Sequence, residues 1–233
     1  MNIDEFLNEL EKININLDQE KLDKLSKYYE LLVEYNKVMN LTGITEKKEV
    51  YLKHFYDSLT IVKVINLNNY ESLCDIGTGA GFPGIVLKIV FPNLKITLVD
   101  SLQKRVNFLN IVIRELELEN IEAIHGRIEE FSLNNRNKFD ITTSRAVAHT
   151  SILLEYAIPL TKVNGYFIPL KANMDCELKE SENAIKKLNV KLIKKEIFEL
   201  PIEKSTRTIL VFKKEKDNLL YPRKYSEIKK HRL

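Results

Sequence analysis

The sequence predicts an α/β fold with a mostly parallel sheet, an antiparallel C-terminal end and a helical N-terminal extension. Three observations predict it. Apolar residues recur at helical spacing in the first part of the chain. Short β-rich runs then alternate with helical stretches, which is typical of parallel strands joined by right-handed crossovers. Finally, the last two β-rich runs are separated by too few residues for a crossover helix.

Residues 1–66 are expected to form the helical extension. Helices are predicted over residues 4–12, 18–39 and about 46–65. Asp18 is a suitable N-cap for the second helix, and the turn that follows residue 39 ends it. The extension is acidic, since residues 1–50 carry 7 Lys/Arg against 11 Asp/Glu. Residues 67–233 are expected to form the sheet domain.

Five strands of this domain are predicted to be parallel. They are Ser72–Ile76, Ile96–Asp100, Ile121–His125, Phe139–Thr143 and Val163–Ile168. Helices are expected between them, near residues 83–91, 102–117, 127–131 and 149–160. Two further strands, Val190–Phe198 and Arg207–Phe212, are expected to pair antiparallel through a short connection.

Composition and the chain start favour a cytoplasmic protein. Hydrophobic residues make up 44% and charged residues 30%, as in ordinary globular domains. The sequence has no apolar run near the roughly 20 residues that a membrane span needs, so no membrane partner is expected. The start, MNIDEFLNELEK, is acidic and amphipathic, unlike a secretory signal.

Charge and cysteines narrow the partners only slightly. The net charge of +3 is weak support for a polyanionic partner. Residues 213–233, with 8 Lys/Arg and 3 Asp/Glu, either contact phosphate or form a solvated, frayed end. The sequence has no CxxC motif or Cys/His cluster, so no metal site is expected. Cys74 is interpreted as a core thiol and Cys176 as a helix residue of no special role.

A glycine-rich turn stands at the end of the first predicted strand. Four of the seven glycines fall within Gly77–Gly84, in the segment LCDIGTGAGFPGIVLKIV. Such a turn needs glycine because the backbone must reach positive φ and because a side chain would keep a ligand away from the backbone. The helix that follows is expected to present free N–H groups to a polar or anionic ligand.

An acidic residue ends the second predicted strand. Asp100 lies 23 residues after Gly77. In nucleotide-binding α/β sheets this spacing places an acid at the tip of the neighbouring strand, where it accepts hydrogen bonds from ribose hydroxyls. The alternative role, capping the next helix, is compatible with the first.

The spacing of the glycines bears on the cofactor. The dinucleotide fingerprint is GxGxxG, and Gly77 and Gly79 fit it, but Phe82 stands at the third position. The observed pattern is GxGxG, which resembles motif I of the class I (Rossmann-like) methyltransferases, whose cofactor is S-adenosyl-L-methionine. The antiparallel C-terminal end also resembles that family. A nicotinamide-dependent enzyme is the minor alternative.

Methyltransferase chemistries differ in the residues they require. Methylation of a pyrimidine at carbon 5 needs a cysteine nucleophile, and the sequence has no Pro-Cys loop. Methylation of an exocyclic amine commonly uses an Asn/Asp-Pro-Pro-aromatic motif, where this chain reads FDITTSRAVAH. Methylation of a ring nitrogen with a free lone pair, such as guanine N7, needs only that the base be held in line with the methyl group.

Several segments resemble the RsmG family, also called glucose-inhibited division protein B. They lie in order between about residues 36 and 223: NLTGI (40–44), His54 with DSL (57–59), DIGTGAGFPGI (75–85), LVDSLQKRVNFL (98–109), GRIEEF (126–131), FDITTSRAVA (139–148) and YPR (221–223). The resemblance implies an enzyme that methylates N7 of the guanine at position 527 of bacterial 16S ribosomal RNA. Its partner is then the small ribosomal subunit, and nothing in the sequence requires more than a monomer.

Two other functions stay open on the sequence. One is a methyltransferase that acts on another RNA or on a small molecule. The other is a cofactor-binding assembly factor without catalytic turnover.

The resemblance also places the cofactor. It implies contacts at Gly77, Phe82, Ile128, Glu129 and Arg145, beside the Gly79 and Asp100 already considered. Phe82 is suited to shelter the cofactor, and Glu129 follows the third strand, where a polar contact to adenine is expected. Arg145 follows the fourth strand and is suited to a carboxylate or to RNA. As plain alternatives, Ile128 is a core residue and Arg145 a surface charge.

The substrate side is expected on four other residues. His54 and Asp57 share a helix face, either as a local hydrogen-bonded pair or, with Asn40, as a cover over the active site. Lys171 ends the fifth strand; the family often has Lys-Gly there, whereas this chain has Lys171-Ala172. Lys104 and Arg105 either contact RNA phosphate or form a solvated face. No catalytic acid or base is assigned.

Overall fold

The computed structural model describes residues 1–145, 147–172 and 175–233, without the side chains of residues 175 and 176. Ala146, in the segment that resembles the RsmG family, and the side chain of Cys176 therefore lie outside the described residues. Cys74 is a buried free cysteine, as expected.

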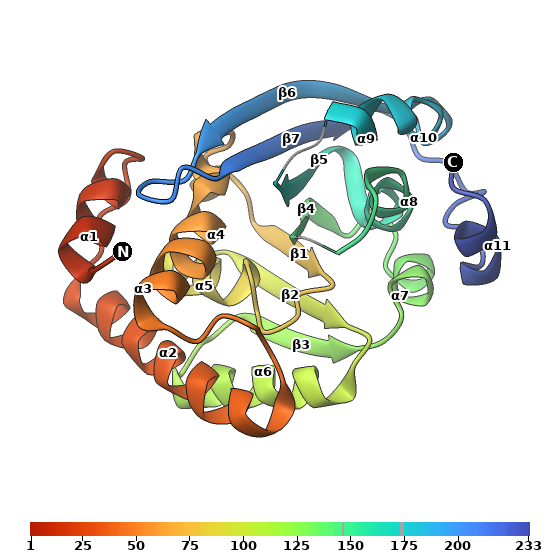
Figure 1. Ribbon diagram of the computed structural model, residues 1–233. Coiled ribbons are helices and arrows are strands. Elements are labelled where there is room, and N and C mark those ends of the chain that lie inside the picture. Colours follow the sequence, from red (N-terminus) through yellow and green to blue (C-terminus); the bar gives the residue numbers. More distant parts are fainter. Residues whose placement is uncertain (146, 173–174) are drawn as a thin grey trace.

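A seven-stranded sheet runs through the described part of the chain, in the order β3-β2-β1-β4-β5-β7-β6 (Figure 1). Its strands are β1 (Ser72–Ile76), β2 (Lys95–Asp100), β3 (Ile121–His125), β4 (Phe139–Arg145), β5 (Thr161–Lys171), β6 (Val190–Glu199) and β7 (Thr206–Lys214). The first five pair in parallel, and β7 lies between β5 and β6, antiparallel to both. The predicted fold class is confirmed.

Four helices connect the parallel strands near the predicted positions: α5 (Gly84–Val90), α6 (Gln103–Glu115), α7 (Ile128–Asn134) and α8 (Thr150–Leu160). Between β5 and β6 lie two short helices: α9 (Asp175–Glu180), which contains residue 176 as expected of a helix residue, and α10 (Glu182–Lys187), which the sequence did not predict. The C-terminal segment forms α11 (Tyr225–Lys230) and buries Ile228 and Leu233. The alternative of a frayed C-terminal end is therefore wrong.

The N-terminal part is helical, as predicted. Helix α1 (Ile3–Glu11) precedes α2 (Gln19–Met39), and the Asp18 side chain accepts a hydrogen bond from the N–H of Lys21, as an N-cap does. The expected regular helix over 46–65 is instead a chain of α3 (Lys47–Val50), the π-helical η1 (Tyr51–Tyr56), α4 (Asp57–Leu59) and the 3₁₀ turn η2 (Thr60–Lys63). A further 3₁₀ turn, η3 (Leu67–Asn69), leads into β1. Such π-helical turns change the direction of side chains and are frequent at functional sites.

Hydrophobic residues are buried on both faces of the sheet. On one face, Phe6, Leu32 and Phe55 of the N-terminal part belong to the same buried cluster as Leu73 and Ile85 of the sheet domain. The other face is covered by α7, α8 and α10 (Figure 1). The division at residue 66 therefore stays a proposal about organisation, because one core spans it.

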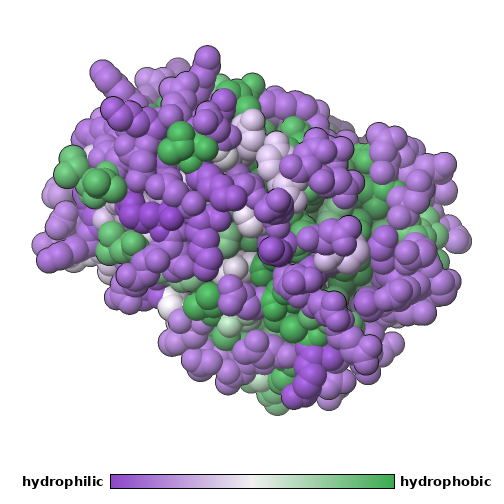
Figure 2. Space-filling model, turned by 180° about the vertical axis from the view of Figure 1, so that it is seen from behind, coloured by the Kyte–Doolittle hydropathy of each residue, from purple (hydrophilic) through white to green (hydrophobic). Residues whose placement is uncertain are grey.

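Seen from behind, the surface is mostly hydrophilic, with hydrophobic side chains in scattered groups (Figure 2). Within the described residues, no helix is long and apolar enough to cross a membrane.

Candidate functional site

A cavity of about 610 Å³ lies at the carboxyl ends of the central strands. β1 lies between β2 and β4, so the chain order reverses there, and ligands of open α/β sheets bind at such a point. The cavity is lined by eight of the residues that the sequence predicted: His54, Gly77, Gly79, Phe82, Asp100, Ile128, Glu129 and Arg145.

The glycine loop forms the floor of this cavity. Gly77 and Gly79 have φ of +67° and +63°, so the predicted positive φ is confirmed. A Cβ on Gly77 would lie 2.8 Å from Cγ2 of Val147, which leaves no room for a side chain. A Cβ on Gly79 would meet no protein atom within 4 Å, so that the backbone there is open to a ligand.

Asp100 fastens the loop to the end of β2. Its carboxylate accepts hydrogen bonds from the N–H of Gly79 and of Leu102, both at 2.9 Å, and lies 3.3 Å from Nη1 of Arg105. The side chain is almost fully buried yet borders the cavity. Asp100 therefore orders both the loop and the approach to α6 at the place where a ribose is expected.

A second carboxylate, that of Asp75, lies beneath the loop. Its Oδ2 accepts hydrogen bonds from the Thr78 hydroxyl (2.7 Å) and from the N–H of Gly84 (2.9 Å). Burial raises the pKa of Asp75 to about 6. The expectation that α5 offers its free N–H groups to a ligand is wrong for Gly84, the first residue of α5, because Asp75 takes that donor.

An aromatic and cationic cluster forms the opposite wall. The His54 ring stacks on Phe82 with centroids 4.5 Å apart, and the Arg145 guanidinium lies 5.1 Å from the Phe82 centroid. Nη2 of Arg145 is 3.2 Å from Nδ1 of His54, and Oγ1 of Thr42 is 3.0 Å from its Nε2. Burial, and then the charge of Arg145, lower the pKa of His54 to about 3, so this imidazole is neutral at physiological pH.

Asp57 lies behind this wall, where it is 6% exposed. Its two carboxylate oxygens accept hydrogen bonds from Nη1 of Arg145 at 3.3 Å and from Nε of Arg207, in β7, at 3.0 Å. Arg145 therefore links His54 and Asp57, in place of the local hydrogen bond that was one of the two interpretations of their spacing. Arg145 is the last residue of β4 and is largely buried, so the surface-charge alternative is wrong.

The third part of the cavity wall is the start of α7. Ile128 and Glu129 line the cavity, and Glu129 accepts a hydrogen bond from Nε of Arg127. The Arg127 guanidinium stacks on Tyr225, with Cζ 3.8 Å from the ring centroid. Ile128 is half-buried beside the second hydrophobic cluster, so it serves both the core and the cavity.

Three predicted residues do not line the cavity. Asn40 is the left-handed C-cap of α2 and directly precedes Leu41 and Thr42, which do line the cavity. Asp57 acts through Arg145. Lys171 donates hydrogen bonds to the Ala148 carbonyl and to Glu177. Their roles toward a substrate stay predictions.

Other residues of the wall escaped the sequence analysis. Thr42, Arg127, Tyr156 and Tyr225 line the cavity, as does Arg105, for which the sequence left two roles open. Lys104 donates a hydrogen bond to the Met39 carbonyl at 2.8 Å, which neither interpretation of this residue anticipated. Two of the wall residues had a signal in the sequence: Arg127 directly precedes a predicted helix at the end of a strand, and Thr42 lies in the segment NLTGI that resembles the family.

The cavity fits S-adenosylmethionine. Its volume is in the range of small-molecule sites, about 300–1,000 Å³. It combines an open glycine backbone, an acid at the ribose position and an aromatic wall, which are the features that the sequence predicted for this cofactor.

Comparison with known proteins decides the family. The family model described as rRNA small subunit methyltransferase G matches residues 21–207. The chain belongs to this family. Two relatives named ribosomal RNA small subunit methyltransferase G, from Lysinibacillus sphaericus and Bacillus subtilis, are each 46% identical over 228 residues. The alignments cover 96% of this chain and 96% and 95% of the relatives, so the predicted family is confirmed.

Solved structures agree on the fold of this chain. A SAM-dependent methyltransferase from Aquifex aeolicus superposes with a TM-score of 0.54 at 18% identity, over 72% of this chain and 93% of that one. Mitomycin 7-O-methyltransferase gives 0.58 at 13% identity, over 79% and 60%. Family and fold together confirm the prediction of a methyltransferase that uses S-adenosylmethionine.

Proposed function

We propose that this protein transfers the methyl group of S-adenosylmethionine to N7 of a guanine in 16S ribosomal RNA, at position 527 as the family resemblance implies. The observation that carries the proposal is the meeting of the glycine loop, Asp100 and the Phe82–His54–Arg145 wall at one cavity, in a chain of this family.

The residues around the cavity divide the work of holding the cofactor. Asp100 would accept hydrogen bonds from the ribose hydroxyls, and Gly79 would let the cofactor approach the backbone, while Gly77 borders the cavity and makes room for Val147. Ile128 and Glu129 stand at the end of β3, one strand further out, where the base is expected. When bound, S-adenosylmethionine supplies an activated methyl group on a sulfonium.

Guanine N7 suits a site without a general base, since its lone pair is free and no proton has to leave. The residues described at the cavity match this requirement. The one imidazole there, His54, is already engaged by Thr42 and Arg145 and is neutral. A neutral His54 also adds no positive charge beside a purine that becomes cationic. The rate is expected to come from holding the base in line.

Arg145 and Arg207 share the Asp57 carboxylate, and the carboxyl groups of Asp75 and Glu203 also interact electrostatically with Arg145 and Arg207, respectively. Arg145 lines the cavity, where its guanidinium could pair with an anionic group. The carboxylate of the cofactor and a phosphate of the RNA are the two candidates, as the sequence analysis left them. Either role places Arg145 at the boundary between cofactor and substrate.

Further cations at the cavity favour RNA as the substrate. Arg105 and Arg127 line it with side chains 33% and 45% exposed. The net charge of only +3 favours a folded RNA–protein particle, because tight binding to naked RNA by charge alone needs many phosphate contacts. The proposed partner is therefore the small ribosomal subunit. We propose that the protein acts on it as a monomer in the cytoplasm.

Methyl-labelled S-adenosylmethionine tests the proposal against its alternatives. The protein is incubated with small subunits that lack the modification, with free 16S rRNA, with large subunits and with small-molecule extracts. We expect label in 16S rRNA, and more from subunits than from free RNA. Label only in other RNA or in small molecules would contradict the substrate, and cofactor binding with no transfer would support an assembly factor.

A further inference from the structure

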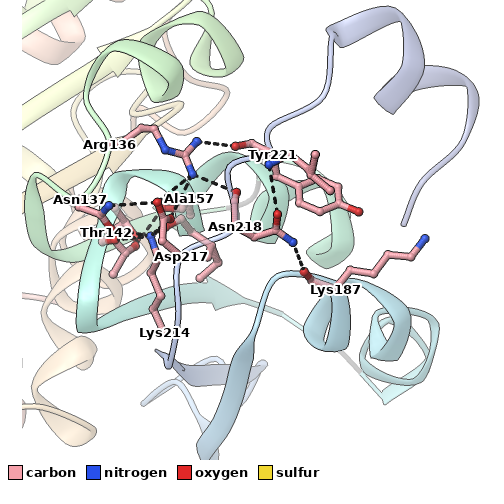
Figure 3. Close-up of polar contacts among 12 residues, drawn as sticks. Arg136, Asn137, Thr142, Ala157, Lys187, Lys214, Asp217, Asn218 and Tyr221 are labelled. Atoms are coloured by element: carbon pink, nitrogen blue, oxygen red, sulfur yellow. Dashed lines mark hydrogen bonds and ion pairs between the residues drawn. The ribbon is translucent and has the colours of Figure 1, made fainter.

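The C-terminal segment, residues 215–233, returns to the cavity. It follows β7 and lies beyond the residues that the family model matches, 21–207. Arg136 anchors its first part: Nη2 is 3.1 Å from both carboxylate oxygens of Asp217 and 3.0 Å from the Asn218 carbonyl, and Nη1 donates to the Tyr221 carbonyl (Figure 3). Asn218 in turn donates to the Lys187 carbonyl at 2.9 Å. The segment therefore leaves the sheet along a fixed path.

A buried ion pair anchors the second part. Nε and Nη2 of Arg223 each donate to one oxygen of Glu155, both at 2.8 Å, and the Arg223 N–H adds a third bond at 2.9 Å. The Glu155 side chain is 1% exposed. Bidentate pairs of this kind fix direction as well as position. Two residues further on, Tyr225 begins α11.

These anchors bring Tyr225 to the cavity wall. Its ring borders the cavity beside Ile128, and one face is occupied by the Arg127 guanidinium. Arg127 is itself held by Glu129. Helix α11 packs through its buried residue Ile228, whereas Tyr225, at the start of the same helix, is 42% exposed. Arg127 therefore covers one face of the Tyr225 ring, and the residue stays partly exposed at the cavity.

The order of the strands tells which part of the cofactor meets this ring. Asp100 marks the ribose at the end of β2, and Arg127 to Glu129 follow β3, the next strand outward. The base therefore points toward Tyr225 and away from Phe82 and His54. We propose that the Tyr225 ring, backed by Arg127, packs against the adenine of S-adenosylmethionine. This inference rests on the proposed function.

The absence of tryptophan from the sequence makes a direct probe of this contact possible. In the Tyr225→Trp protein the only indole stands at the proposed adenine site. Added S-adenosylhomocysteine should quench its fluorescence with saturation, since stacked adenine quenches indole. The matched control is Leu219→Trp, at a 79% exposed position of the same segment, and its fluorescence should not change. Equal responses from the two proteins would overturn the proposal.

Affinity gives an independent test. Tyr225→Ala should weaken S-adenosylhomocysteine binding in calorimetry by about tenfold, while Tyr225→Phe should stay within about twofold because it keeps the ring. Binding of 5′-methylthioadenosine, which keeps adenine but lacks the amino-acid part, should weaken by the same factor. Lys230→Ala, in the same helix and exposed, is the control and should bind as the unchanged protein does.

The outcomes separate this inference from the proposed function. If the unchanged protein binds the cofactor and methylates RNA while Tyr225→Ala keeps full cofactor affinity, only the inference is overturned. If Tyr225→Ala instead raises the KM for RNA alone, the ring contacts the substrate and the inference is again overturned. If the unchanged protein fails to bind the cofactor, both proposals fall.

Discussion

His54 shows how a residue's surroundings set its chemistry. An ordinary histidine titrates near pH 6.5, but burial beside Arg145 lowers the pKa of His54 to about 3. Between these values the unfolded chain binds a proton that the folded protein does not. The stability due to His54 is therefore present above pH 6.5 and is lost as the pH falls toward 3. Asp75 behaves in the opposite sense: with a folded pKa of about 6, its contribution is present below pH 3.8 and is lost as the pH rises through 6.

This pair gives a pH prediction. Between about pH 4 and 6, His54 makes the free energy of unfolding rise with pH and Asp75 makes it fall. In the unchanged protein these two effects largely cancel. His54→Phe keeps a ring against Phe82 but removes the titrating imidazole. The free energy of unfolding of this variant should therefore fall as the pH rises from 4 to 6, because only the effect of Asp75 remains. The free energy of unfolding of the unchanged protein relative to this variant should rise with pH between 4 and 6, by up to about 1.4 kcal/mol per pH unit. Urea unfolding across this range measures it, and parallel curves would contradict it.

Arg145 is expected to be important for activity because it contacts several groups at the cavity wall. Lysine at this position keeps the charge but cannot reach His54, the Lys53 carbonyl and Asp57 together. Arg145→Lys should lower the single-turnover rate of methyl transfer by about tenfold to hundredfold, the equivalent of one or two charged hydrogen bonds. Arg114→Lys, 74% exposed, is the matched control. Equal rates in the two variants would contradict a role of Arg145 in methyl transfer.

Sequence reasoning found the residues that sit directly after strands or in the glycine loop, because position along a parallel sheet fixes where a strand ends. It missed residues that reach the site by tertiary contact. Thr42 is there through its bond to His54, Arg207 through Asp57, and Tyr225 through the anchors of the C-terminal segment. Neither hydrophobic periodicity nor position at a strand end signals such contacts, although Thr42 lies in the segment NLTGI that resembles the family.

At the scale of elements, the glycine loop is the least tolerant turn of the site. Gly77→Ala should cost about 2–5 kcal/mol, since alanine at positive φ costs about 1–2 kcal/mol and the contact with Val147 adds an overpacking cost. Gly43→Ala is the control: it has no positive φ and no atom within 4 Å of a Cβ, so stability should change by less than about 0.5 kcal/mol. Thermal or denaturant unfolding measures both.

The order and positions of the strands could be predicted, since buried β-rich runs separated by helices leave few alternatives. Their ends were less accurate, most of all at β5, which spans Thr161–Lys171 where Val163–Ile168 was predicted. The helix over residues 46–65 was predicted only in outline. Its apolar spacing is helical throughout, but packing against the sheet imposes a π-helical turn over Tyr51–Tyr56, which turns His54 toward Phe82. Periodicity does not record such a change of winding.

At the scale of the whole molecule, the N-terminal helices are part of the core and of the site. Phe6, Leu32 and Phe55 are fully buried, and the Tyr28 hydroxyl donates to the Ala80 carbonyl in the glycine loop. The fragment 67–233 should therefore fail to unfold cooperatively or to bind S-adenosylhomocysteine. Circular dichroism and calorimetry on the fragment test this, and a fragment that folds and binds would make residues 1–66 a separate domain.

The proposed reaction of the whole molecule is methyl transfer to guanine N7 in the small ribosomal subunit. The most direct measurement is nucleoside analysis and primer-extension mapping of 16S rRNA after reaction of unmodified subunits with the purified protein and S-adenosylmethionine. We expect 7-methylguanosine at a single guanine, and about tenfold to hundredfold less of it with Arg145→Lys at the same early time points. A different methylated nucleoside, or 7-methylguanosine spread over many sites, would contradict it.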